Sequence, residues 1–179
     1  FSIQSFGCRV NQAEAFLWAE EFQRHGLECE ENFSHSDLVV VNSCTLTSKA
    51  DSDVRSFINR AARLNPKAKL VVTGCFAERA ADVLKSFPHV WRVFSNAEKD
   101  GLTKEVLSLV GPTKNEVPAR SIRSRALLKV QDGCNFRCSF CIIPSVRGRS
   151  VSLEKSKALF LIREFISQGF REIVLTGIH

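Results

Sequence analysis

The sequence lacks the features that mark several large protein classes. No apolar run reaches the roughly 18 residues that a membrane-spanning helix needs, and the first residues form a polar, strand-like pattern instead of a signal peptide. Internal repeats and low-complexity segments are absent as well. With 44% hydrophobic and 25% charged residues, the composition is that of a globular protein. These observations exclude a coiled coil, a disordered tail and a membrane protein, and we expect a cytoplasmic location with no membrane partner.

Cysteine is the one residue type that is unusually frequent for a chain of 179 residues. There are seven cysteines, an odd number, and nothing marks the chain as secreted. A disulfide framework is therefore a poor explanation, and the sequence favours metal binding or redox chemistry.

Basic residues are concentrated in the second part of the chain. Residues 1–110 hold 13 Lys/Arg and 14 Asp/Glu, whereas residues 111–179 hold 12 and 5. Most of this excess lies in residues 114–149, where eight basic residues stand against two acidic ones. Such a tract indicates an anionic partner, most commonly a nucleic acid. A solvated basic face is the alternative, and charge alone does not decide between them.

The first 110 residues alternate strand and helix patterns. Strand-like runs lie at residues 2–6, 38–41, 70–72 and 90–94, and helices are expected over residues 11–26, 48–65, 77–86 and 102–110. Asn11 with Glu14, and Ser48 with Asp51, have the spacing of helix caps. The alternating order predicts an α/β domain over residues 1–110, with a parallel sheet and flanking helices.

Three cysteines occupy equivalent places in this pattern. Cys8, Cys44 and Cys75 each follow the C-terminal end of an expected strand. Because the carboxyl ends of parallel strands meet at one edge of a sheet, we expect these cysteines to share a site there. Burial of free cysteines in the core is the other explanation. Cys29 lies in a polar, acidic stretch and is interpreted as incidental.

A second unit follows a segment that resembles a linker. Residues 111–125 contain two prolines and several small polar residues. Residues 126–131, 153–168 and 172–176 then predict a strand, a helix and a strand, which together form one βαβ unit. Either this unit adds to the first sheet or it begins a larger domain. We favour the start of a (β/α) barrel, because residues 126–179 are far fewer than the roughly 250 residues of a complete barrel.

Cys134, Cys138 and Cys141 form the strongest chemical signal in the sequence. Their C-x₃-C-x₂-C spacing, on a loop between a strand and a helix, suits three irons of a 4Fe–4S cube. The fourth iron would keep an open coordination position, as a catalytic metal requires. A zinc site is the main alternative, but it needs a fourth ligand such as His179. A redox-switch cluster is a third possibility.

This cysteine triplet, with Phe140 directly before its last cysteine, resembles the radical S-adenosylmethionine (SAM) signature. The resemblance implies that SAM binds the open iron. It also implies that an electron from the cluster cleaves SAM to a radical that abstracts hydrogen. A flavodoxin- or ferredoxin-like electron donor is then expected.

Four further segments make the resemblance more specific. Residues 5–14, 41–47, 72–75 and 141–148 together resemble the radical-SAM methylthiotransferases, in order and over nearly the whole chain. The resemblance implies a second 4Fe–4S cluster on Cys8, Cys44 and Cys75, and hence two clusters in all. It also implies that the barrel is only begun here and that an RNA-binding β-domain follows it, so that these 179 residues alone are not expected to be active.

Within this family, residues 7–14 and 175–179 are most similar to the branch that modifies threonylcarbamoyladenosine in tRNA. The resemblance implies that a methylthio group is added at C2 of this adenosine, next to the anticodon. The branch acting on isopentenyladenosine usually has Gln and Met where Arg9 and Val10 stand, and the ribosomal-protein branch has Pro and Lys. Both branches remain alternatives, and a non-catalytic iron–sulfur or zinc RNA-binding module is an alternative of another class.

The resemblance and the basic tract also assign further contacts. SAM contacts are expected from four residues: Phe140, Arg147, Thr176 and Gly177. Arg147 is a candidate for pairing with a SAM carboxylate or an RNA phosphate. Contacts to the tRNA backbone are expected from four arginines: Arg120, Arg123, Arg125 and Arg149. Asn11 and Glu14 also lie in a family-like motif, although helix capping is a sufficient explanation for both. The oligomeric state is left open.

Overall fold

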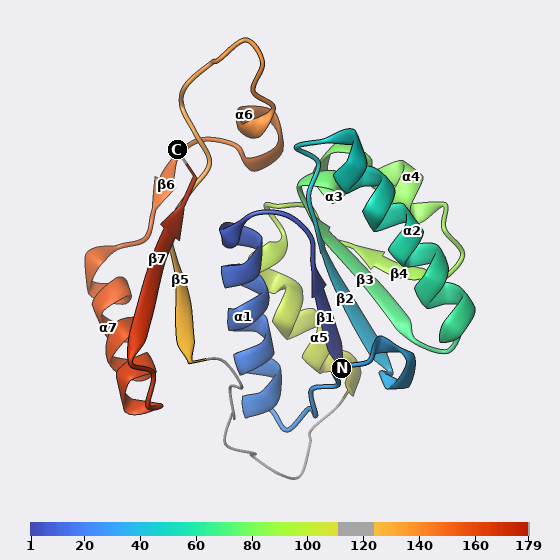
Figure 1. Cartoon of the computed structure of the whole chain (residues 1–179), viewed down its shortest axis with the longest axis horizontal. Coiled ribbons are helices and arrows are strands. Elements are labelled where there is room, and N and C mark those ends of the chain that lie inside the picture. Colours follow the sequence, from blue (N-terminus) through green and yellow to red (C-terminus); the bar gives the residue numbers. More distant parts are fainter. Residues whose placement is uncertain (111–123, 179) are drawn as a thin grey trace.

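Two sheets lie on either side of one helix, α1 (Arg9–Arg24), in the computed structural model (Figure 1). The structure describes residues 1–110 and 124–178. None of the helices in these two ranges is long and apolar enough to cross a membrane.

The first sheet has four parallel strands in the order β1-β2-β3-β4, which confirms the predicted parallel sheet. The strands are β1 (Ser2–Ser5), β2 (Leu38–Ser43), β3 (Lys69–Gly74) and β4 (Val90–Val93). All six residues of β2 are buried, as expected for a strand that is covered on both faces. The register pairs Ser5 with Asn42 and Ser43 with Gly74, so the carboxyl ends of the first three strands lie at one edge.

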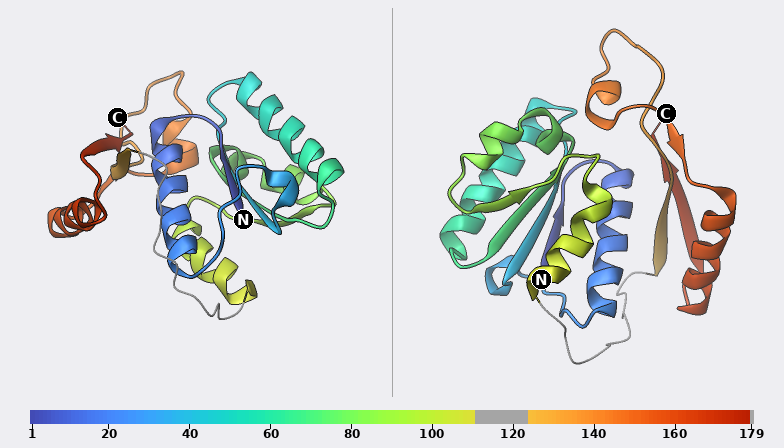
Figure 2. Two further views of the ribbon diagram at one scale, coloured as in Figure 1. Left: turned by 60° about the horizontal axis from the view of Figure 1, so that its bottom comes forward. Right: turned by 180° about the vertical axis from the view of Figure 1, so that it is seen from behind.

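Helices cover both faces of this sheet. Val39, Val41, Leu70 and Val72 pack on one face against residues of α2 (Ser48–Leu64), α3 (Cys75–Arg79) and α4 (Ala81–Lys85). Val40 and Val71 point to the other face, where they pack with residues of α1 and of α5 (Leu102–Val110). The view from behind in Figure 2 shows α5 beside α1 on this face. Alternate strand residues therefore build two cores, one on each side of the sheet.

Two local expectations for this unit are corrected. The helix expected over residues 77–86 is divided into α3 and α4, which meet at Ala80. The cap of α2 is Thr47, one residue before the expected Ser48, and its hydroxyl accepts a hydrogen bond from the Ala50 N–H at 3.1 Å. Two short 3₁₀ turns, η1 (Phe33–His35) and η2 (Lys99–Gly101), complete the unit.

The second unit is a separate three-stranded sheet, so it does not extend the first one. Its strands β5 (Arg125–Asp132) and β7 (Glu172–Gly177) are parallel, and α7 (Lys155–Ser167) connects them in the predicted βαβ order. The sequence did not predict α6 (Ile143–Arg147) or β6 (Val151–Ser152), which pairs antiparallel with β5. The expected linker at residues 111–125 lies outside the described residues except for its last two, and the second of these, Arg125, already begins β5.

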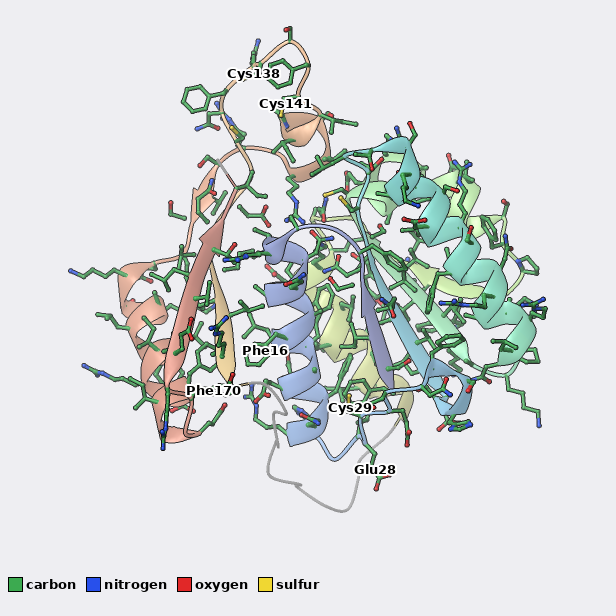
Figure 3. The ribbon with its side chains drawn as sticks, viewed as in Figure 1. Phe16, Glu28, Cys29, Cys138, Cys141 and Phe170 are labelled. Carbon is green, nitrogen blue, oxygen red and sulfur yellow. The ribbon has the colours of Figure 1, made fainter. Side chains whose placement is uncertain are left out.

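The two units are joined by the second apolar face of α1. Phe16 of this helix is 6% exposed and packs edge-to-face against Phe165 and Phe170, with ring centroids 5.6 Å away in each case. Ala126 and Leu128 of β5 complete this small core. Figure 3 shows Phe16 and Phe170 between α1 and the second sheet. Helix α1 therefore belongs to both units.

Replacing Phe16 with Ala should loosen the second unit from the first. Loss of a buried phenyl ring costs about 3–5 kcal/mol, and here the ring lies between the units. We expect faster amide hydrogen exchange in β5 and β7, with β2 and β3 still protected. The matched control is Phe160→Ala on α7, because Phe160 is 60% exposed. Equal acceleration in both sheets would contradict a role for Phe16 in docking.

Candidate functional site

The three strand-end cysteines lie at the same edge of the first sheet. Cys8 follows β1 at the N-cap position of α1, Cys44 follows β2, and Cys75 is the first residue of α3, directly after β3. Gly7 has a φ of 110°, and a Cβ on it would lie 2.5 Å from the Cβ of Cys44 and 2.7 Å from its Sγ. The loop before Cys8 can therefore pass directly against Cys44 only because residue 7 has no side chain.

Three thiols are a donor set that a 4Fe–4S cube accepts, because each thiolate binds a separate iron and the three sulfurs need not meet at one point. Among the described residues, no three His, Cys, Asp or Glu side chains form a group that could hold a single metal ion. Cys8, Cys44 and Cys75 would hold a 4Fe–4S cluster at the sheet edge.

The second triad lies on the loop between β5 and α6, and Figure 3 shows Cys138 and Cys141 there. Cys138 is exposed, and Cys134 and Cys141 are half-buried. The loop is held at its base, where the Cys134 N–H donates to the Gly148 carbonyl at 3.1 Å. Gly133 has a φ of 70°, and a Cβ there would collide with the Arg149 carbonyl. A cavity of about 350 Å³ is lined by Cys134 but not by Cys138 or Cys141. These three thiols are the residues of the loop that could hold a cluster.

Cys29 lies far from Cys138 and Cys141. It is exposed near the bottom of Figure 3, whereas Cys138 and Cys141 lie at the top. It lines a different cavity, between α1 and β1, which contains no other cysteine among its lining residues. Its interpretation as incidental stays a prediction.

A buried ionic network, which we call the Glu14 network, connects the two units. Its members share direct or relayed contact with the Glu14 carboxylate: Asn11, Glu14, Asn42, Lys99, Lys129, Asp132 and Arg147. The Glu14 side chain is 4% exposed, and Lys99 donates to its Oε2 at 2.7 Å. Lys129 of β5 lies 2.9 Å from the other carboxylate oxygen, Oε1. One carboxylate of α1 therefore binds cations from both units.

Arg147, at the end of α6, links this network to a cysteine of the first triad. Its side chain is 1% exposed. Nη1 contacts both carboxylate oxygens of Asp132, at 2.9 and 3.1 Å, and lies 3.3 Å from Glu14 Oε1. Nη2 donates to Asn11 Oδ1 at 2.5 Å, and Nε donates to the Cys75 sulfur at 3.2 Å. The segment that follows the second triad therefore contacts a cysteine of the first.

The network holds its two carboxylates, Glu14 and Asp132, in the charged form. Burial by itself raises the pKa of Glu14, but Lys99, Lys129 and Arg147 outweigh it and hold this pKa far below the usual range. The pKa of Asp132 is also lowered, because Arg147 and Lys129 outweigh the effect of burial. Burial lowers the pKa of Lys99 despite its contact with Glu14. Burial raises the pKa of the Cys75 thiol, although Arg147 and Lys99 oppose this rise.

The capping interpretation of Asn11 and Glu14 is wrong. Helix α1 begins at Arg9, and no side chain caps it. Asn11 instead donates through Nδ2 to the carbonyls of Phe6 and Ser43, at 3.1 and 2.9 Å, and Asn42 donates to Glu14 Oε2 at 2.9 Å. Residues three apart on a helix share a face. The spacing of Asn11 and Glu14 therefore suits a capping box, and it equally suits two side chains that both point into the network.

The expected SAM contacts lie in different surroundings. Phe140 is 92% exposed on the cysteine loop, and Thr176 and Gly177 lie at the carboxyl end of β7, next to the end of β5. Arg147 has four protein partners, of which three belong to the network and the fourth is Cys75. Its contact with SAM or RNA, like the other three SAM contacts, stays a prediction.

The expected RNA contacts do not form one cluster within the part of the chain that the structure describes. Arg125 begins β5 and pairs with Glu172 at 2.6 Å, whereas Arg149 is exposed beyond the other end of that strand. Arg120 and Arg123 lie outside the described residues. The four arginines remain predicted contacts.

Comparison with known proteins identifies the family. Residues 1–95 match the model described as "Uncharacterized protein family UPF0004". The chain belongs to this family. Residues 128–179 match the Radical SAM superfamily, so the two matches correspond to the two units. In the Glu14 network, Glu14 comes from the UPF0004 region, and Lys129, Asp132 and Arg147 come from the radical-SAM region.

Curated relatives of this UPF0004 chain confirm the resemblance to the radical-SAM methylthiotransferases, with MtaB-like proteins among the matches. Two are named threonylcarbamoyladenosine tRNA methylthiotransferase MtaB: one of Chlamydia pneumoniae, 38% identical over 100% of this chain, and one of Bacillus subtilis, 32% identical over 99%. A tRNA-2-methylthio-N(6)-dimethylallyladenosine synthase of Endomicrobium trichonymphae is 27% identical over 99%. The match covers 43%, 43% and 44% of these relatives, so this chain spans under half of their length.

Replacing Glu14 with Gln should destabilise the protein by about 3–5 kcal/mol at neutral pH, because it leaves buried cations without their partner. The pKa of Glu14 is depressed by folding, so its stabilising effect is fully present above its unfolded-state pKa of about 4.3. The effect is lost progressively as the pH falls below that value. Urea unfolding across this pH range should therefore show the difference from wild type shrinking in acid.

The control for this prediction is Glu172→Gln. Glu172 also pairs with a cation, but its side chain is 52% exposed, so we expect a loss below about 1 kcal/mol. A Glu14→Gln difference that stays constant from neutral to acid pH would argue against a charged Glu14 in the folded protein.

Proposed function

We propose that this protein is a tRNA methylthiotransferase that adds a methylthio group at C2 of N6-threonylcarbamoyladenosine, beside the anticodon, by radical-SAM chemistry. The observation that carries the proposal is the contact of Arg147 with Cys75, which joins the segment after one cysteine triad to a cysteine of the other. In the proposed reaction the radical would form at one centre and sulfur would be held at the other, so the two centres would have to lie close together. The names of the relatives from Chlamydia pneumoniae and Bacillus subtilis support this nucleoside as the substrate.

Cys134, Cys138 and Cys141 would hold the radical-SAM cluster, and SAM would bind beside it. When bound, this cofactor pair supplies the electron and the radical needed to open the inert C2–H bond of adenine. The chain itself provides the cavity of about 350 Å³ next to Cys134. The chain also orients this cavity, because a hydrogen bond from the Cys134 N–H to the Gly148 carbonyl holds the base of the loop.

Cys8, Cys44 and Cys75 would hold the auxiliary cluster. When bound, this cluster offers an iron without a cysteine ligand, where sulfur to be transferred can be held. Cys44 and Cys75 are 4% and 2% exposed, so the chain keeps this side of the centre away from water. A second SAM would serve as methyl donor, and a flavodoxin- or ferredoxin-like protein as electron donor.

Residues 124–178 would be the start of a (β/α) barrel, preceded by a methylthiotransferase α/β domain over residues 1–110. Strand β7 is at the edge of its sheet, and Leu175 on it is 58% exposed. Phe160 and Ile166 of α7 are 60% and 59% exposed. Further strands and helices of a barrel would cover such an apolar surface.

A second candidate is the same reaction on isopentenyladenosine in tRNA. The relative named tRNA-2-methylthio-N(6)-dimethylallyladenosine synthase supports it, at 27% identity. Both candidates predict the same two clusters and differ only in the nucleoside. The other two alternatives are a ribosomal-protein substrate and a non-catalytic RNA-binding module. The following experiments distinguish them from the two tRNA reactions.

Anaerobic reconstitution of the intact protein should give about eight irons, four for each cysteine triad. Changing Cys134, Cys138 and Cys141 together to Ala should leave about half of that iron. The control is Cys29→Ala, which should leave all of it. Stoichiometric zinc, or full iron in the triple variant, would contradict the cluster assignment.

The substrate is tested by mass spectrometry of tRNA nucleosides from cells with and without the gene. We expect the methylthio form of threonylcarbamoyladenosine to disappear, and unmodified threonylcarbamoyladenosine to accumulate. Loss of the methylthio form of isopentenyladenosine instead would establish the second candidate. No change in any tRNA nucleoside would reject both.

The two triads should be separable by activity. With Cys8, Cys44 and Cys75 all changed to Ala, SAM cleavage to 5′-deoxyadenosine should continue, because the radical triad is intact. Methylthiolation should stop, because no sulfur is delivered. Equal loss of both activities in a folded variant would contradict separate roles.

A further inference from the structure

Arg147 reaches two of the three strand-end cysteines. Its Nε donates directly to the Cys75 sulfur at 3.2 Å. Its Nη2 donates to Asn11 Oδ1 at 2.5 Å, and the same oxygen lies 3.4 Å from the Cys8 sulfur. The guanidinium therefore stands beside the auxiliary triad, although Arg147 belongs to the segment of the radical triad.

The position of Arg147 is fixed from several directions. Asp132 at the end of β5 accepts two hydrogen bonds from Nη1, and Glu14 of α1 lies 3.3 Å from the same nitrogen. The neighbouring residue Val146 accepts a hydrogen bond from Asn96 of the first unit. The guanidinium thus donates to partners on α1, α3 and β5 at the same time. The compact ammonium group of a lysine could not make this set of contacts.

Arg147 brings a buried positive charge to the sulfur of Cys75. Its Nε–H points at this sulfur, with the two atoms 3.2 Å apart, and its side chain is 1% exposed. A buried cation favours an anion beside it, such as a thiolate-bound cluster.

We propose that Arg147 is a positioning residue that raises the reduction potential of the auxiliary cluster and fixes that cluster relative to the radical loop. The proposal rests on the proposed function, because it requires a cluster on Cys8, Cys44 and Cys75. Reduction adds one electron to the cluster from a one-electron donor, and no bond forms or breaks. The added negative charge is stabilised by the nearby guanidinium and by its N–H···S bond, which makes reduction easier.

The sequence position of Arg147 gives this contact a second consequence. Arg147 is the last residue of the short helix α6, which begins two residues after Cys141, the last cysteine of the radical loop. Because its guanidinium is anchored at Cys75 and Asp132, the radical loop and the sheet edge keep one relative orientation. Sulfur held at one centre and a radical formed at the other would then meet a bound adenine in a constant geometry.

The test uses the intact protein in which Cys134, Cys138 and Cys141 are all changed to Ala, so that only the auxiliary cluster remains. After anaerobic reconstitution with iron and sulfide, the cluster is titrated with dithionite and followed by visible absorbance and electron paramagnetic resonance. Arg147→Gln and Arg147→Lys are compared with this parent. Arg149→Gln is the matched control, because it removes the same charge from an exposed side chain two residues away.

We expect Arg147→Gln to shift the midpoint potential to a more negative value while the iron content stays unchanged. Arg147→Lys should shift it in the same direction by less, because it keeps the charge and loses the N–H···S bond. Arg149→Gln should have the same midpoint potential as the parent. If Arg147→Gln does not fold, the Arg147→Lys shift decides, since that variant keeps the cation.

Two results would overturn the proposal. One is that the folded Arg147 variants carry full iron and have the same midpoint potential as the parent. The other is loss of iron with no change in the potential of the cluster that remains, which would limit Arg147 to assembly. A parent that binds no iron would instead refute the auxiliary cluster of the proposed function, and the inference would fall with it.

Discussion

The buried carboxylate of Glu14 is the interaction on which the arrangement of both units depends. It lies on α1, between the two sheets, and binds Lys99 of the first unit together with Lys129 and Arg147 of the second. Removal of several charges from water is costly unless every charge finds a partner. These partners come together only when the units are docked, so the network favours one relative orientation over nearby alternatives.

Much of the first unit could be predicted because its signals are local. The runs that form β2 and β3 are continuous and apolar, and their ends place Cys44 and Cys75 at one sheet edge. The match of the second unit to the Radical SAM superfamily could also be predicted, since the spacing of the three loop cysteines lies within eight residues. By contrast, α6 and β6 have five and two residues, too few for a periodic pattern to be recognised.

The Glu14 network could not be predicted from the sequence. Lys99, Lys129 and Asp132 resemble ordinary solvated charges, and only the packing of η2 and β5 around α1 brings them together. The one signal was the pair Asn11 and Glu14, whose spacing suits a capping box as well as a shared helix face. The structure decides between these two explanations, because Glu14 binds residues that are far away in the sequence. The local spacing of residues does not reveal such partners.

The two-sided burial of α1 means that the sequence boundary between the family regions is not a structural boundary. Phe22 of this helix belongs to the core of the first sheet, and Phe16 belongs to the core of the second. A chimera that joins the first unit of one relative to the second unit of another would have to match both faces of a single helix. We therefore expect the two regions to be inherited, and to diverge, as a pair.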